Sequence, residues 1–340
     1  MTTSTDPHAD PTAAPLKTRG RVLPSPVTPA EIALVAVIVV LWIALAFATP
    51  AFLSAGSIVP LLVEMSPVAL IGIGMTFVII TGGIDVSVGG AIMVCSVITG
   101  KLMRDHGLPV LGCLAVALGT GAVLGLVNGA LIAYGRVHAI IITFGTANLF
   151  LFIGLQIFAS QPISGMPNTL AWFGRGVDGR TLAIPHSFAI TVVLAAIAWW
   201  YLRHTPGGRH FFGVGGDPVA ARLAGIRVQR RILIAYVITG VLVGLASIFT
   251  LAKGTSNLDQ SVGSGQELAV IAAVVIGGTS IMGGRGSVLG TVLGALLVQT
   301  VKSGVTQLGW PSQLSDLFVG IFIVVAVGTD LVRRRARRDP

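Results

Sequence analysis

Charged residues are scarce in this sequence. Asp, Glu, Lys and Arg make up 10% of its 340 residues, whereas a soluble domain carries about 25%. The scarcity excludes an ordinary soluble globular protein. The formal net charge of +9 does not indicate a nucleic-acid partner, because membrane proteins concentrate Lys and Arg in their cytoplasmic loops.

Three further absences limit the kinds of binding and catalytic site that the sequence can form. The two cysteines, Cys95 and Cys113, both lie in apolar segments, so no disulfide or metal framework is implied. No G-x-x-x-x-G-K-[ST] stretch is present, so the chain cannot cradle ATP phosphates in that way. Ser, His and Asp occur, but no nucleophile and base stand out as a pair. We therefore expect no enzyme, no cofactor and no metal site.

Apolar sequence is abundant instead. Hydrophobic residues make up 54% of the chain, and long apolar runs recur from residue 31 onward. This pattern predicts an all-α polytopic membrane protein with about ten transmembrane or re-entrant helices. The third, eighth and ninth runs are short for a full span of about 20 residues, which suggests broken or re-entrant helices. The expected segments are 31–49, 58–80, 88–103, 109–133, 138–159, 183–202, 232–252, 268–282, 287–301 and 315–332.

The distribution of Lys and Arg predicts the topology. With a cytoplasmic N-terminus and ten crossings, 16 of the 22 Lys and Arg lie inside, as the positive-inside rule requires. Eight crossings would give the same parity. Both termini are therefore expected in the cytoplasm, with a disordered tail over residues 1–30, a membrane domain over 31–332 and a basic tail over 333–340. The first apolar run is long for a signal peptide, so we expect it to be retained.

Small residues recur at every fourth position in three stretches. Each row lies on one helix face and lets a neighbouring backbone approach closely. The rows predict tight helix packing and do not identify what the protein transports or binds. They are Gly121, Gly125 and Gly129; Gly240 and Gly244; and Gly286, Gly290 and Gly294.

Residues 203–231 form a long basic loop between the sixth and seventh segments. Within it, DPVAARLAG predicts a short helix: Asp217 can cap its N-terminus, Pro218 suits its first position, and Gly225 can end it in a left-handed conformation. A free helix of about eight residues is marginal in water. It must therefore pack on its own protein or the lipid surface, or dock into a groove on a cytoplasmic partner.

Three stretches of this chain resemble one protein family. GRHFFGVGGDPVAARLAGIRV resembles the cytoplasmic coupling segment of ABC-type permeases for monosaccharides such as ribose, xylose and rhamnose. GMTFVIITGGIDVSVGG and GSGQELAVIAAVVIGGTSIMGGRGSVLGTVLGALL also resemble that family. Asp217 stands where the family commonly has Asn, and either residue can cap a helix. His138 in VHAIIITFGTANLF replaces a proline of the family pattern, which leaves the substrate open.

The resemblance implies the transmembrane subunit of an importer in the bacterial cytoplasmic membrane, working by alternating access. It further implies partners: a cytoplasmic ATP-binding-cassette ATPase, a periplasmic or lipid-anchored solute-binding protein, a second permease copy or paralogue, and membrane lipid. Specificity would then lie mainly in the binding protein, and ribose, xylose, rhamnose or a furanosyl autoinducer remain candidates. The residues implied in coupling to the ATPase are Asp217, Ala220, Ala221, Arg222, Leu223 and Gly225.

Asp85 is an acid between apolar segments, just after Gly82 and Gly83. A carboxylate at membrane depth costs at least about 2.5 kcal/mol on insertion scales, and irregular backbone is tolerated there only inside protein or along a wet cavity. Asp85 could cap the third helix from a cytoplasmic-side turn with help from Ser87, line the translocation path, or bind a coupling proton or ion.

A second glycine pair repeats this arrangement, because the spacing from Gly82 to Gly89 equals that from Gly277 to Gly284. The equal spacing hints at an internal repeat, with both breaks at helix ends around a conduit. Glu267 is expected at the outer surface, and Glu64 at a path or a helix interface. The candidates for the path or the helix breaks are Gly82, Gly83, Asp85, Ser87, Asn148, Gly277, Gly278, Thr279 and Ser280.

Two alternatives to an ATP-driven importer differ in class. Broken helices near an acid also suit an ion-coupled secondary transporter, which would take up solute without an ATPase. An intramembrane enzyme would need a nucleophile paired with a base.

Overall fold

The computed structural model describes residues 28–159, 162–165, 168–174, 176–253 and 257–335. Nearly all of the predicted N-terminal tail, and the last five residues of the basic tail, lie outside these ranges. The described part is α-helical apart from the 3₁₀ helices η1 (Asn168–Phe173) and η2 (Val177–Gly179), a bridge between Ile163 and Leu258, and a two-stranded hairpin of β1 (Arg180–Thr181) and β2 (Ile184–Pro185). The α-helices are α1 (Pro29–Ala48), α2 (Ala55–Ile80), α3 (Val88–His106), α4 (Val110–Gly135), α5 (Ala139–Phe158), α6 (His186–His204), α7 (Pro206–Gly216), α8 (Pro218–Leu223), α9 (Val228–Leu251), α10 (Gln266–Ile276), α11 (Val288–Gln307) and α12 (Gln313–Arg335).

Each of the ten expected segments contains one helix. Seven described helices are long and apolar enough to cross a membrane: α1, α2, α4, α5, α6, α9 and α11. The prediction that the ninth segment is short is wrong, because α11 continues past Lys302 to 20 residues. The third segment similarly extends to a helix of 19 residues. Only the eighth, α10, remains short at 11 residues. These findings confirm an all-α polytopic membrane fold.

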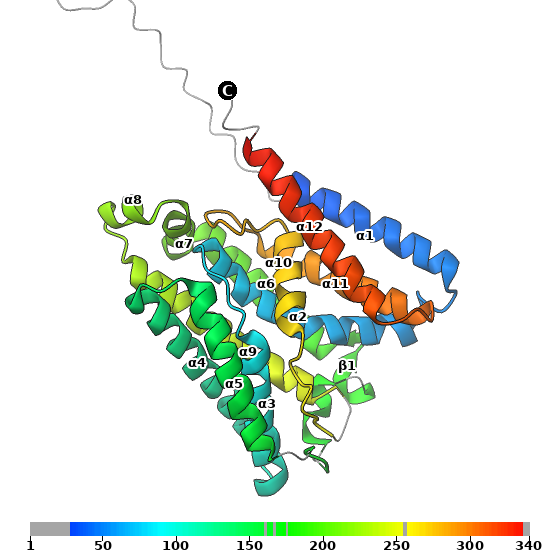
Figure 1. Cartoon of the computed structure of the whole chain (residues 1–340). Coiled ribbons are helices and arrows are strands. Elements are labelled where there is room, and N and C mark those ends of the chain that lie inside the picture. Colours follow the sequence, from blue (N-terminus) through cyan, green and yellow to red (C-terminus); the bar gives the residue numbers. More distant parts are fainter. Residues whose placement is uncertain (1–27, 160–161, 166–167, 175, 254–256, 336–340) are drawn as a thin grey trace, which may run out of the picture.

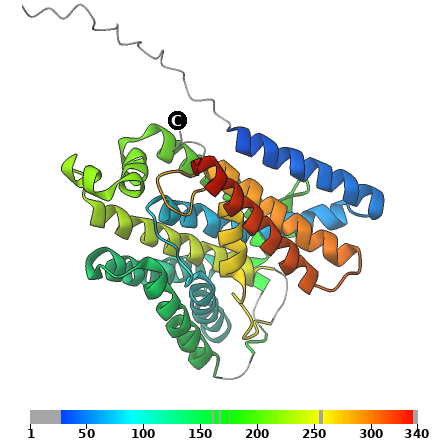
Figure 2. The same ribbon diagram turned by 45° about the horizontal axis from the view of Figure 1, so that its top comes forward.

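The helix α2 forms the centre of the bundle. In its most apolar window, 94% of residues are buried, compared with 22% for α1, α4 and α5. Figure 1 shows α1, α11 and α12 on one side of the bundle and α3, α4 and α5 on the other, and Figure 2 shows the same arrangement after rotation. The hydroxyls of Thr76 and Thr291 lie 2.7 Å apart and join α2 to α11. Helix α2 also packs closely on α9, since a Cβ on Gly74 would lie 2.7 Å from the Cα of Thr239.

The glycine rows pack helices against each other, as predicted. A Cβ added to Gly240 of α9 would collide with the carbonyl oxygen of Gly121 on α4, and one added to Gly125 would collide with that of Tyr236. Such close contact of two backbones requires residues without side chains at the crossing. The third row does the same for α11, where a Cβ on Gly290 would collide with the carbonyl of Gly277 at the end of α10.

Candidate functional site

Helix α2 ends in a left-handed glycine turn. Gly82 has φ of 85°. Its N–H donates to the carbonyl of Ile79 at 2.9 Å, and the N–H of Gly83 donates to the carbonyl of Val78 at 3.1 Å. These two bonds form a Schellman motif, in which a residue without a Cβ satisfies the last carbonyls of a helix. The helix therefore stops here because of its own sequence.

Helix α10 ends in the same way. Gly278 has φ of 87°, its N–H donates to Val275 at 2.9 Å, and the N–H of Thr279 donates to Val274 at 3.2 Å. The two helix ends thus share one hydrogen-bond pattern. The left-handed residue of the second motif lies one position later than the equal glycine spacing predicts.

The end of α2 and the loop after α10 meet a third segment at a cluster that we call the glycine hub, made of residues 80–83, 215–216 and 283–284. The N–H of Gly284 donates to the carbonyl of Ile80 at 2.9 Å. Gly215, in the last turn of α7, packs on both: a Cβ there would collide with the Ile80 carbonyl and lie 2.7 Å from the Gly284 nitrogen. The basic loop is therefore in direct backbone contact with the end of α2 and with the loop that follows α10.

Thr279 and Ser280, predicted at the path or a break, are both 3% exposed. The hydroxyl of Thr279 accepts the N–H of Ser287 at 3.3 Å, and the N–H of Ser280 donates to the carbonyl of Arg285 at 3.0 Å. Both residues thus belong to the break between α10 and α11, where they hold its loop closed.

The start of α1 is tied to the same loop. Thr28 and Glu31 form a capping box, in which the N–H of Thr28 donates to the Glu31 carboxylate at 2.5 Å. The other oxygen of Glu31 bonds to the hydroxyl of Ser287, the N-cap of α11. Glu31 is 3% exposed. The N-terminal end of α1 therefore lies at the hub end of the bundle.

After the hub, residues 81–87 turn back into the bundle. Gly82 lies beside Gly283, in the loop that follows α10. Gly89 lies near the start of α10, because a Cβ there would be 2.8 Å from the carbonyl oxygen of Gly263 and would collide with the Glu267 carboxylate. Helix α10 rises about 16 Å over its 11 residues. Since the segment reaches from one end of α10 to the other, α3 begins inside the protein. Glu267, expected at the outer surface, is half-buried at this point.

Asp85 lies within the re-entering segment and is 4% exposed. Its Oδ1 accepts the N–H of Ser87 at 2.9 Å and the Ser87 hydroxyl at 2.6 Å. Ser87 is the N-cap of α3, although its side chain makes no cap bond to that helix. The amide of Asn128 on α4 donates to the Ser87 hydroxyl at 2.7 Å. Of the three alternatives for Asp85, this geometry favours a turn at the start of α3 over a position on an open path.

The neighbouring carbonyl of Ile84 is also satisfied by side chains from other helices. The hydroxyl of Thr143 on α5 donates to it at 3.1 Å, and that of Tyr236 on α9 at 3.4 Å. A segment without regular structure is thereby supported by α4, α5 and α9, which provides the internal hydrogen bonds that membrane-embedded backbone requires.

Asn148, the predicted path residue on α5, is exposed, and its amide donates to the carbonyl of Phe144 at 2.9 Å. The start of α3 lies beside it, since a Cβ on Gly90 would lie 2.7 Å from the carbonyl of Ala147. Asn148 does not contact the Asp85 network directly. It lies on the exposed face of α5 among apolar side chains such as Phe152, which is 58% exposed.

Helix α8 has the caps that its sequence predicts. Asp217 Oδ1 accepts the N–H groups of Val219 at 2.8 Å and Ala220 at 3.0 Å, and Gly225 has φ of 80°. Two large apolar side chains point away from the protein: Val219 is 65% exposed and Leu223 is 86% exposed.

The opposite face of α8 anchors it. Ala221, one of the predicted coupling residues, is 5% exposed and packs with Val214 of α7 and Val228 of α9. Ile226 packs against the same cluster. Ala221 therefore faces the protein, and a contact with a partner would fall to Val219 and Leu223.

Glu64 on α2 forms an ion pair with Lys253, just beyond the end of α9, with a distance of 2.6 Å between Oε2 and Nζ. The two side chains are 26% and 17% exposed, respectively. This agrees with the expectation that Glu64 lies at an interface between helices. Sequence reasoning missed its partner, which is 189 residues away.

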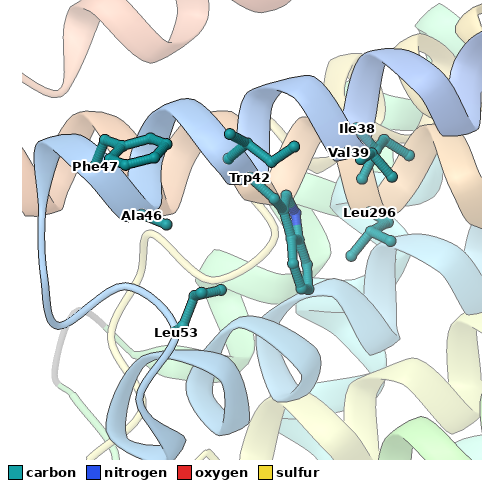
Figure 3. A pocket seen from close by; sticks show the side chains of 8 residues that line it. Ile38, Val39, Trp42, Ala46, Phe47, Leu53 and Leu296 are labelled. Atoms are coloured by element: carbon teal, nitrogen blue, oxygen red, sulfur yellow. The ribbon is translucent and has the colours of Figure 1, made fainter.

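An apolar groove of about 610 Å³ opens beside α1 (Figure 3). Ile38, Trp42 and Leu53 are among its eight lining residues, all of which are apolar. The indole N–H of Trp42 is engaged by the hydroxyl of Thr300 at 3.1 Å. Because the groove offers no free polar group to a hydroxylated solute, we do not assign solute binding to it. Within the described ranges, no three His, Cys, Asp or Glu side chains are placed to hold a metal ion.

Comparison with known proteins gives consistent relatives. The family of permease components of branched-chain amino acid transport systems matches residues 57–327. The ribose import permease RbsC of Bacillus subtilis is 38% identical over 86% of this chain and 89% of the relative. The fructose import permease FrcC of Rhizobium meliloti is 33% identical over 82% of this chain and 79% of the relative. The autoinducer 2 import permease LsrD of Photorhabdus laumondii is 30% identical over 87% of this chain and 90% of the relative. No solved structure matches the chain.

Proposed function

Because the chain belongs to this family of permease components and is the transmembrane subunit of an ATP-binding-cassette importer, we propose that it carries a monosaccharide or a closely related solute. The relatives named for ribose, fructose and autoinducer 2 import cover most of this chain, and this similarity is the observation that carries the proposal. The family's own description names branched-chain amino acids, so the solute is inferred from the relatives.

We propose that both termini face the cytoplasm and that the ten membrane segments all cross or re-enter the bilayer. The hub, the basic loop and the start of α1 lie at one end of the bundle, which we assign to the inside. Placing the arginines of the basic loop there agrees with the positive-inside rule. The β-hairpin then lies outside, well apart from α8 in Figure 1.

The proposed coupling begins at α8. Its exposed Val219 and Leu223 form a short apolar ridge, which suits a groove on the cytoplasmic ATPase. The opposite face of α8 is fixed to α7 and α9. A movement of the ATPase would therefore displace α7 together with α8.

The hub carries that movement to the membrane helices. Gly215 at the end of α7 touches the backbone of Ile80, the last residue of α2, and that of Gly284 in the loop between α10 and α11. The contact is between backbones, with no flexible side chain in between, so a shift of α7 moves the end of α2 and the loop between α10 and α11. Alternating access then follows from rearrangement around α3 and α10, whose first turns meet at Gly89 and Glu267.

We place the solute path along the surface where α3, α5 and α10 meet. Asn148 is exposed there, and Glu267 is half-buried beside Gly89. Exposed polar groups at membrane depth are costly against lipid, so a second permease copy or a paralogue is expected to cover this face. The solute-binding protein would deliver solute from the outside.

The solute assignment is tested by uptake in cells. Cells that lack the protein are expected to lose accumulation of one labelled monosaccharide and to regain it when the chain is restored. Labelled ribose, xylose, rhamnose and fructose serve as the panel, with labelled leucine as the control that the family's description suggests. Restored uptake of leucine, with no response to any monosaccharide, would reject the proposal.

A further inference from the structure

A small pocket adjoins Asp85, at the start of α3. Its polar wall consists of Asp85, Ser87 and Asn128, and the remainder is apolar, including Leu124 and Phe150. Its volume of about 10 Å³ is comparable to the space that one water molecule requires. None of the proposed coupling steps uses this pocket.

The hydrogen bonds around the pocket in the described part of the chain leave one acceptor, Oδ1 of Asn128, without a donor. The single hydroxyl hydrogen of Ser87 is used by Asp85, so the group of Asn128 that faces Ser87 must be its NH₂, and its Oδ1 faces elsewhere. Asn128 is 1% exposed, and its Oδ1 has no hydrogen-bond partner in the described part of the chain. A buried acceptor without a donor costs free energy, so the pocket calls for a donor.

Among the described residues, the carboxylate of Asp85 likewise has no cation beside it to neutralise its charge. The ion pairs that join Arg104 to Asp105 and Lys253 to Glu64 in the described part of the chain do not involve Asp85. The titratable groups with contacts to residues 84–89 include the Tyr236 phenol of α9, which donates to the Ile84 carbonyl, and Glu267 of α10 beside Gly89. Neither supplies a positive charge. A buried carboxylate without a cation is strongly disfavoured.

We propose that Asp85 is a proton-binding site, and that one water molecule in the pocket carries a hydrogen bond from the protonated carboxyl to Asn128 Oδ1. Because Oδ1 of Asp85 already accepts two hydrogen bonds, the proton resides on Oδ2. The water has polar partners in Asp85, Ser87 and Asn128, within the two to four that a buried water needs. A sodium ion fits less well, because only three side chains offer it oxygens and the rest of the wall is apolar.

A protonated Asp85 would remove the charge from the re-entering segment, which lies beside the glycine hub. The break between α2 and α3 could then shift during transport without moving a charged carboxylate through apolar surroundings. This proposal concerns the state of one side chain and does not depend on the solute or on the ATPase.

Infrared spectroscopy of the full-length protein in lipid vesicles at neutral pH tests the proposal. We expect a carbonyl band of a protonated carboxylic acid, lost in Asp85→Asn and retained in the matched control Glu267→Gln. Asn128→Ala should shift the band without abolishing it, since it removes the acceptor and keeps the acid. Loss of only ionised-carboxylate bands in Asp85→Asn would overturn the proposal.

A second measurement does not rely on the variants folding. Asp85 is the one buried aspartate among the residues whose burial the structure describes, so wild-type protein made with carbon-13-labelled aspartate should show the acid band at lower frequency. An unshifted band would contradict the proposal. Replacing Na⁺ with a bulky organic cation should leave the band unchanged, and a band that appears only after Na⁺ removal would identify a sodium site instead.

Discussion

Leu223→Asp is expected to abolish ATP-driven uptake and to prevent the permease from co-purifying with its ATPase. Leu223 is 86% exposed at the end of α8, so the substitution does not disturb the core. In the proposed complex the same side chain is buried in the partner, and a charge there would remain without a counter-ion. Truncating the central residues of an interface typically costs at least about 2 kcal/mol, which corresponds to about a 30-fold loss of affinity.

The matched control for co-purification is Leu182→Asp. Leu182 is an exposed leucine, with 93% of its surface accessible, in the hairpin far from α8 (Figure 1). Its φ of 50° is one that aspartate tolerates better than most residues. If Leu223→Asp still co-purified with the ATPase and transported solute at the wild-type rate, α8 would not be the coupling element.

Gly215→Ala is expected to separate ATPase binding from transport. A Cβ at this position would collide with the Ile80 carbonyl and lie 2.7 Å from the Gly284 nitrogen. Both neighbours are backbone atoms and cannot rotate away, so the hub must open. The exposed face of α8 is unchanged, so the variant should still bind the ATPase while uptake falls to background. Overpacking of this kind costs about 1–3 kcal/mol, and a lower melting temperature should accompany the loss.

The adjacent glycine supplies a control on the same helix. A Cβ at Gly216 meets nothing within 4 Å, so Gly216→Ala should transport and melt like the wild type. Uptake, co-purification and melting temperature are measured for both variants. Equal uptake by Gly215→Ala and Gly216→Ala would show that the hub does not transmit the movement.

Much of the fold could be predicted from the sequence because it depends on local properties. Long apolar runs mark the membrane helices, and the short helix α8 has its cap at Asp217 and its left-handed end at Gly225 as expected. The ends of helices were less predictable. Helix α11 continues past Lys302, because a polar residue near a helix end does not stop the backbone hydrogen bonds.

The candidate site was only partly predictable because its contacts are distant in sequence. The glycine pairs indicated two breaks, but nothing in the spacing indicates that they touch each other and Gly215. Likewise, Asp85 was singled out as an acid in apolar surroundings, whereas its connection through Ser87 to Asn128, 41 residues from Ser87, requires the fold. Ala221 was predicted to contact a partner with its neighbours, but on so short a helix only packing determines which side is covered.

Uptake into sealed lipid vesicles tests the central claim most directly, which is that this chain is a gate driven by a separate motor. The permease is reconstituted alone, or together with its ATPase and solute-binding protein, and labelled solute inside the vesicles is measured. Accumulation is expected only with both partners and hydrolysable ATP, and not in response to a proton or sodium gradient. Accumulation by the permease alone under such a gradient would contradict the account and favour an ion-coupled transporter.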